Sequence, residues 1–162
     1  MNRYHWNIVF GIAIVLALTV LAAWPFLAHP GLPRHTDAEL HVFRAAQLGE
    51  ALRSGAGYVR WAPDLWLGYG YPIFNYYSPL TYYLANLIAL VGLDIVTAVK
   101  AVFILGLLGA AAGMYVFVRA NWGERAGVVA AAVYVFSPYL LFIDPHMRGD
   151  LAEFFAHFAS RR

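Results

Sequence analysis

The sequence contains no cysteine, which excludes disulfide bonds, thiolate metal sites and cysteine nucleophiles. Charge is also scarce, because Asp, Glu, Lys and Arg together make up only 12% of the residues. The formal net charge of +2 is too small to indicate a nucleic-acid partner. By contrast, 62% of the residues are hydrophobic and the mean hydropathy is +0.61. A soluble domain of this length cannot bury so much apolar surface, so the composition predicts a membrane protein.

Three apolar stretches are long enough to cross a bilayer, which takes about 20 residues. They cover about residues 7–28, 96–119 and 125–143. A fourth stretch, 79–93, is short for a span and is predicted either as a short transmembrane helix or as a helix in the interface. The first stretch also has a rival interpretation as a cleaved signal peptide, with Arg3 as its positive region. The predicted fold is therefore all-α, with three or four transmembrane helices.

The segment 29–78 is polar and aromatic, and we expect it to form an outer loop. Early in it, residues 34–44 pack two carboxylates, two histidines and two arginines into eleven positions. Thr36 and Glu39 have the spacing of a capping box. This pattern predicts an amphipathic helix from Asp37 to about 53, lying along the membrane surface.

One face of this helix is polar, because Asp37, His41 and Arg44 follow one another at helical spacing. Further along, residues 58–83 are rich in Gly, Pro, Tyr and Trp, which predicts a shaped loop. Its rings suit either an interfacial belt or a platform for stacking on a sugar, and both interpretations stay open.

The topology decides whether two acidic segments can meet. The connector 119–125 carries two Arg and one Glu, a net charge of +1, whereas 144–153 carries three carboxylates and one Arg, a net charge of −2. Because positive loops favour the cytoplasm, this asymmetry favours three spans, with Asp37 and the second segment, 144–162, both outside. If 79–93 crossed the membrane, the two segments would lie on opposite faces.

The order of these motifs resembles a known family. A first membrane helix, an outer loop with an early Asp, and the run Trp-Ala-Pro…Gly-Tyr-Gly-Tyr-Pro…Tyr-Tyr-Ser-Pro-Leu…Tyr-Tyr are similar to the amino-terminal part of GT-C type glycosyltransferases. The later Arg-Gly-Asp…Glu run resembles the second acidic loop of that family. The resemblance is greatest to bacterial membrane proteins labelled "6-pyruvoyl-tetrahydropterin synthase-related". Because such proteins are longer, it implies that this chain is an amino-terminal fragment.

The resemblance implies transfer of a sugar from a polyprenyl-phosphate donor at the outer face of the cytoplasmic membrane. By position, Asp37 matches the first-loop acidic residue of the catalytic centre, and Asp150 and Glu153 occupy the place of the second-loop motif. This chain has Asp-x-x-Glu there, whereas the family has Asp-x-Asp. The bilayer and the lipid-linked sugar are the partners that the resemblance implies.

Sugar transfer from a lipid phosphate needs a base, a positive charge near the leaving phosphate and a positioned sugar. We expect Asp37 to be the base. Asp37 with His41, or Glu153 with His157, has the spacing to bind a divalent metal ion. The candidate substrate-binding residues are cationic or aromatic: Arg44, Arg148, Lys100, Trp61, Tyr71 and Tyr77.

Each of these residues also has a structural interpretation. Asp37 and Asp150 suit the first turn of a helix, where the macrodipole favours negative charge. His41 suits an interfacial polar position, and Arg148 suits a headgroup anchor. For the whole chain, the alternatives are a non-catalytic protein that binds or transports lipid-linked glycans and a purely structural membrane subunit.

Overall fold

The structure is a computed structural model that describes residues 3–32 and 37–159. It is all-helical, as predicted, and contains no β-strand within these ranges. The elements in chain order are α1 (Arg3–Ala22), α2 (Trp24–Ala28), α3 (Ala38–Arg53), the 3₁₀ turn η1 (Ile73–Asn75), α4 (Leu80–Ala89), α5 (Ile95–Trp122), α6 (Glu124–Val135), the π-helix η2 (Tyr139–Arg148) and α7 (Leu151–Ala159).

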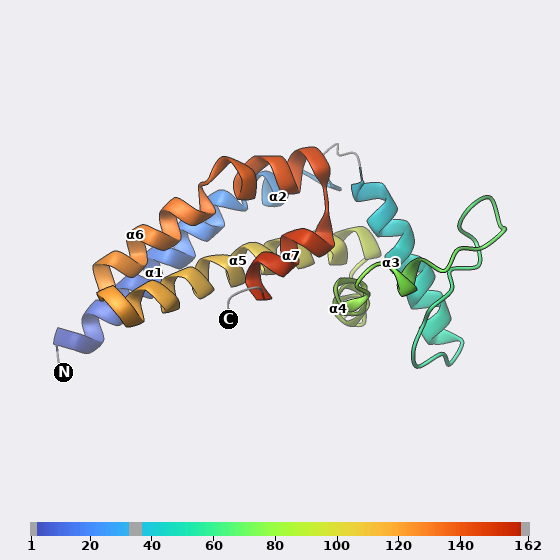
Figure 1. Cartoon of the computed structure of the whole chain (residues 1–162), viewed down its shortest axis with the longest axis horizontal. Coiled ribbons are helices and arrows are strands. Elements are labelled where there is room, and N and C mark those ends of the chain that lie inside the picture. Colours follow the sequence, from blue (N-terminus) through green and yellow to red (C-terminus); the bar gives the residue numbers. More distant parts are fainter. Residues whose placement is uncertain (1–2, 33–36, 160–162) are drawn as a thin grey trace.

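The helices α1, α5 and α6 pack lengthwise against one another (Figure 1). α1 and α6 run in one direction and α5 runs in the other, so the start of α1 and the α5–α6 turn share one end of the bundle. The helices α2, α3 and α4 and the junction between η2 and α7 lie at the other end. The close approach of α6 to α5 requires Gly127, because a Cβ there would lie 2.9 Å from the carbonyl oxygen of Tyr115.

The sequence predicts one apolar span over about 7–28, and the structure divides this stretch into two helices. α1 ends at Ala22, and the short helix α2 begins at Trp24. Pro25 gives the physical reason, because proline has no backbone N–H and its ring clashes with the carbonyl one turn earlier. The chain therefore bends just before it leaves the bundle.

Within residues 3–32 and 37–159, two helical stretches are long and apolar enough by length and composition to cross a membrane: α5, and Glu124–Arg148, which combines α6 with η2. Ile8–Ala22 of α1 is a shorter apolar stretch. The predicted span 125–143 is thus part of a longer stretch that changes helix type after the bend at Ser137. In η2 the N–H of Gly149 bonds to the carbonyl of Asp144 at 2.8 Å, a wide turn of the π type. Such helices are rare and usually short, and they occur often at functional sites.

The helix α4 has ten residues, fewer than the fifteen predicted over 79–93. Its end is followed by a turn in which Gly92 has a φ of +92°, a conformation that glycine adopts without strain. At 1.5 Å per residue the helix is about 15 Å long, half the thickness of the hydrocarbon core. It crosses α5 and does not run along it (Figure 1), and its buried side packs against α3 and α5.

The helix α7 turns back from the far end and packs along α5. Its Phe154 ring covers Gly106 of α5, where a Cβ would lie 3.1 Å from the ring, and also contacts Phe103 with ring centroids 5.6 Å apart. The absence of a side chain at Gly106 therefore allows Phe154 of α7 to pack closely on α5. Gly113 of α5 is different, because a Cβ there would meet nothing within 4 Å.

Candidate functional site

His41 lies at the centre of the end of the bundle that holds α3, α4 and the start of α7. Its side chain is completely buried. Nε2 accepts a hydrogen bond from the backbone N–H of Leu151 at 3.2 Å, so the proton is on Nδ1, which donates to the Tyr82 hydroxyl at 2.8 Å. A single imidazole therefore connects three helices, because Leu151 begins α7 and Tyr82 belongs to α4.

Arg44, one turn after His41, packs on two tyrosines. Its guanidinium carbon lies 4.3 Å from the centre of the Tyr77 ring, and Nη1 donates to the Tyr82 hydroxyl at 3.4 Å. Burial raises the pKa of Tyr82 to about 12, so its hydroxyl stays neutral over the physiological range. Among the described residues Arg44 forms no ion pair with a carboxylate, and the Tyr77 ring and the Tyr82 hydroxyl hold its guanidinium in place.

Asp37 is at the N-cap position of α3, and its backbone N–H donates to the carbonyl oxygen of Arg148 at 3.1 Å. The first charged segment and the second are therefore in direct contact. The carboxylate of Asp37 forms no capping hydrogen bond with the first turn of α3. Thr36, the other half of the predicted capping box, lies outside the described residues.

Asp150 behaves differently. Its Oδ1 accepts hydrogen bonds from the backbone N–H groups of Ala152 at 3.2 Å and Glu153 at 3.1 Å, which caps the start of α7. This is the structural role of an aspartate at the N-cap of a helix. Its Oδ2 lies 3.7 Å from Nη2 of Arg148.

Arg148 is surrounded by three carboxylates. It contacts Glu153 at 2.8 Å, Asp150 at 3.7 Å and Asp144 at 3.7 Å, which gives these four groups a formal net charge of −2. Tyr139 completes the cluster: its hydroxyl accepts from Arg148 at 2.6 Å and donates to Glu153 at 2.7 Å. Asp144 is completely buried, so it relies on the nearby guanidinium to offset the cost of removing its charge from water.

The metal prediction rests on His41 and Asp37. Both ring nitrogens of His41 take part in hydrogen bonds, so a metal ion would have to displace Leu151 or Tyr82 to bind there. Within residues 3–32 and 37–159 no group of three or more His, Asp or Glu side chains has the arrangement of a metal site. The side chain of His157 lies outside the described part of the chain. A divalent metal ion stays a prediction.

The remaining candidates lie apart from this contact between the two segments. Lys100 of α5 donates to the carbonyl oxygen of His29 at 2.6 Å and so connects α5 with the end of α2. Trp61 is half exposed and its indole covers Gly70, where a Cβ would lie 2.5 Å from the ring. Tyr71 is paired with Ala62 by two backbone hydrogen bonds of 2.9 Å.

The loop with Trp61 and Tyr71 has the irregular backbone that its Gly, Pro and aromatic content predicts. At its tip Trp66 and Leu67 have φ values of +55° and +57°, a left-handed conformation that costs free energy in residues other than glycine. Leu67 is also 98% exposed. The loop extends beyond α3, away from the three long helices (Figure 1).

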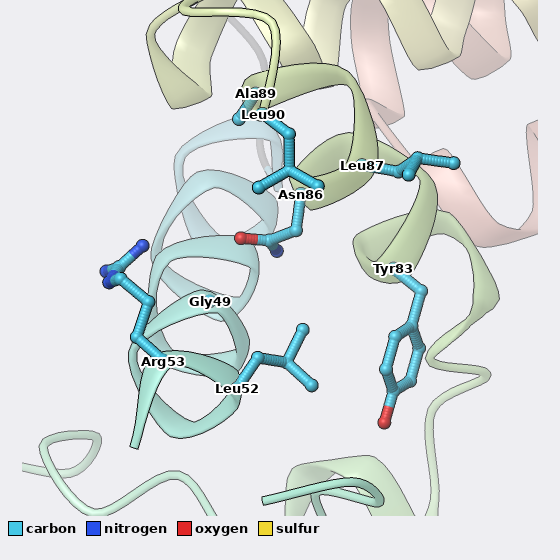
Figure 2. A pocket seen from close by; sticks show the side chains of 8 residues that line it. All are labelled: Gly49, Leu52, Arg53, Tyr83, Asn86, Leu87, Ala89 and Leu90. Atoms are coloured by element: carbon cyan, nitrogen blue, oxygen red, sulfur yellow. The ribbon is translucent and has the colours of Figure 1, made fainter. Parts of the chain in front are cut away.

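A groove of about 410 Å³ lies between side chains of α3 and α4 (Figure 2). Leu52 and Arg53 line it from α3, and Tyr83 and Leu87 line it from α4. At one side Asn86 closes the groove, because its amide donates to the carbonyl oxygen of Ala45 at 2.9 Å. The groove is mostly apolar and lies next to the contact between Arg44 and Tyr82.

Three side chains of this region were not identified from the sequence as site residues: Tyr82, Tyr139 and Asp144. Tyr82 is 41 residues from its partner His41, and no local spacing reports such a contact. Tyr139 faces Glu153 through the wide turns of η2, which α-helical spacing does not predict. A sequence signal exists only for Asp144, a single carboxylate directly after an apolar run and before a proline.

No family model, no curated protein and no solved structure matches this chain.

Proposed function

We propose that this chain is a membrane domain of a GT-C-like glycosyltransferase that takes sugar from a polyprenyl-phosphate donor at the outer face of the cytoplasmic membrane. In this arrangement α1, α5 and the stretch Glu124–Arg148 cross the bilayer. The start of α1 and the α5–α6 turn face the cytoplasm, while Asp37 and Arg148 face outward.

The outward-facing side chains of the long helices support a membrane position. Many of them are large, apolar and exposed, as expected of lipid-facing surface but not of water-facing surface. They include Val9, Phe10, Val20, Leu21, Val116, Phe117, Val129, Val133 and Phe142. The short helix α4 lies across α5, which suits a helix in the interface and supports three spans over four.

The state of Asp37 is the observation that carries the catalytic proposal. An aspartate at an N-cap normally accepts hydrogen bonds from its own helix, as Asp150 does. Asp37 does not, and its backbone is fixed against Arg148 instead. Its backbone thus lies at the contact between the two segments, and its carboxylate has no capping role and can accept a proton from an acceptor within hydrogen-bond reach.

Arg44 is the best candidate for the phosphate of the donor. Arg148 is less suitable, because three carboxylates already surround it. Arg44 is fixed by Tyr77 and Tyr82 and pairs with no carboxylate among the described residues, so its planar guanidinium can bind phosphate oxygens. The nearby groove between α3 and α4 suits the apolar chain of the donor.

Transfer of radiolabelled sugar from a polyprenyl-phosphate donor, with the protein in its own membranes, tests the proposal. The variant Asp37→Asn keeps the size of the side chain and removes the base, so we expect transfer to fall by about 10²–10⁴-fold. Glu39→Gln is the matched control, because Glu39 is an exposed carboxylate in the first turn of the same helix. Arg44→Gln should weaken binding of the donor.

Two outcomes would decide against this function. Undiminished transfer by Asp37→Asn removes the catalytic assignment. Donor binding without any transfer by the unaltered protein favours a protein that binds or transports lipid-linked glycans.

A further inference from the structure

A second groove lies at the opposite end of the bundle from Asp37 and Arg148. It has a volume of about 690 Å³ and runs between α1 and α6, beside the α5–α6 turn. Phe10 and Ile14 line it from α1, and Val128 and Val129 line it from α6. The volume of the groove is typical of a site for a small ligand, and these four lining side chains are apolar.

Glu124 at the mouth of this groove is neutralised within the protein. It forms an ion pair of 2.8 Å with Arg119 and accepts a hydrogen bond from the Tyr115 hydroxyl. Its carboxylate reaches across to α1, where Gly11 leaves room for it: a Cβ at this position would overlap Glu124 Oε1. These contacts hold α1, α5 and α6 together at this end and offset the negative charge.

Arg125 is the remaining charged residue at the mouth. It is exposed, and it pairs with no carboxylate among the described residues. Arg119, Glu124 and Arg125 together have a net charge of +1, and the first turn of α6 has no side-chain cap, so its N–H groups also favour an anion. Trp122, 68% exposed, lines the same mouth with a ring that suits the headgroup level.

We propose that this groove binds an anionic phospholipid, with an acyl chain between α1 and α6 and the headgroup phosphate at Arg125. Each part of the groove matches a part of such a lipid: apolar walls along the helices, and a cation and an indole at their ends. The site is independent of sugar transfer. It requires only that this end of the bundle lie in the cytoplasmic leaflet, where anionic lipids are concentrated.

Native mass spectrometry of the purified, delipidated full chain in detergent tests the proposal. The protein is titrated with phosphatidylglycerol and, separately, with phosphatidylcholine of the same acyl chains. We expect tighter binding of phosphatidylglycerol, and we expect Arg125→Gln to weaken it by about fivefold, the usual contribution of one cation near anionic lipid. Phosphatidylcholine binding should not change in this variant.

Two further variants separate the groove from general charge. Val129→Trp fills the apolar part of the groove. Because Val129 is 62% exposed, this variant should weaken the binding of both lipids without disturbing the core. Arg60→Gln removes an exposed cation from the distant aromatic loop and should change neither. Equal binding of the two lipids, or unchanged binding in Arg125→Gln or Val129→Trp, overturns the proposal. Displacement of phosphatidylglycerol by an equal concentration of glycerol phosphate overturns it too, because the ligand would then be a soluble anion.

Discussion

The backbone N–H of Asp37 donates a 3.1 Å hydrogen bond to the carbonyl oxygen of Arg148. This one bond joins the beginning of α3 to the end of η2. These two segments are far apart in the sequence, because the helices α4, α5 and α6 lie between them. Because backbone atoms make the contact, substitution of either side chain leaves it possible. The charged side chains around it can therefore be altered one at a time.

The variant His41→Ala should unfold more easily. It removes two hydrogen bonds and leaves the Leu151 N–H buried without its acceptor, so we expect a loss of about 2–4 kcal/mol in the free energy of unfolding. Denaturant unfolding in detergent measures the loss, and hydrogen exchange at the Leu151 amide should accelerate. His29→Ala alters an exposed ring and serves as the control. Equal stability of the two variants would contradict the bridging role of His41.

Arg148→Met should destabilise the protein because it removes the cation beside the buried Asp144. We expect a loss of about 3 kcal/mol, the lower end of the range for breaking a buried pair, since Arg148 itself is 44% exposed. The double variant Arg148→Met with Asp144→Leu has no buried charge left and should recover most of the loss. Unfolding curves of the three proteins make the comparison, and a double variant no more stable than the single one would be inconsistent with this account.

Gly106 and Gly113 offer a matched pair on α5. Gly106→Ala pushes a methyl group into the Phe154 ring and should cost about 1–2 kcal/mol, whereas Gly113→Ala meets open space and should gain up to about 1 kcal/mol from helix propensity. Thermal unfolding of both variants should show a lower melting temperature for Gly106→Ala and a higher one for Gly113→Ala. If Gly106→Ala is as stable as Gly113→Ala, α7 does not pack on α5 as described.

The tip of the aromatic loop should gain stability from Leu67→Asn. Asparagine tolerates the left-handed backbone better than leucine, so we expect a gain of up to about 1 kcal/mol. Tyr69→Asn is the control, since Tyr69 is 86% exposed and its φ is not positive. A gain in the control as large as in Leu67→Asn would show that backbone strain is not its source.

The natural absence of cysteine makes the proposed topology simple to test. Single cysteines at positions 39, 121 and 147 leave no background thiol. With three spans, a membrane-impermeant maleimide added to intact cells labels Glu39→Cys and Met147→Cys but reaches Asn121→Cys only after lysis. Labelling of positions 39 and 147 from opposite sides would instead require α4 to cross the membrane.

Local chemistry predicted much of the fold. Asp94 is the N-cap of α5 and accepts from the Thr97 N–H at 3.0 Å, so the start of this helix was readable from the sequence. The end of α3 at Arg53 was also readable, because Gly55 follows it with a φ of +92°, a conformation that glycine adopts without strain. Pro25 also lies in the sequence, but the apolar residues on both sides of it favoured a single span, so the break between α1 and α2 was not predicted.

Contacts across long separations were not readable. The face shared by Asp37, His41 and Arg44 was predicted, but helical spacing does not tell that Tyr82 and Leu151 are the partners of His41. Likewise, α-helical spacing does not describe the wider turns of η2, so the position of Tyr139 against Glu153 could not be derived from the sequence. The number of spans and the roles in sugar transfer stay predictions.

The His41 bridge also sets an order of events during synthesis. Its acceptor nitrogen is matched to an amide 110 residues downstream. At roughly 5–20 residues per second, a ribosome takes about 6–20 s to make that interval. Until α7 is made, α3 and α4 lack the Leu151 amide that completes their shared polar centre, so the end of the bundle that holds His41 is completed last.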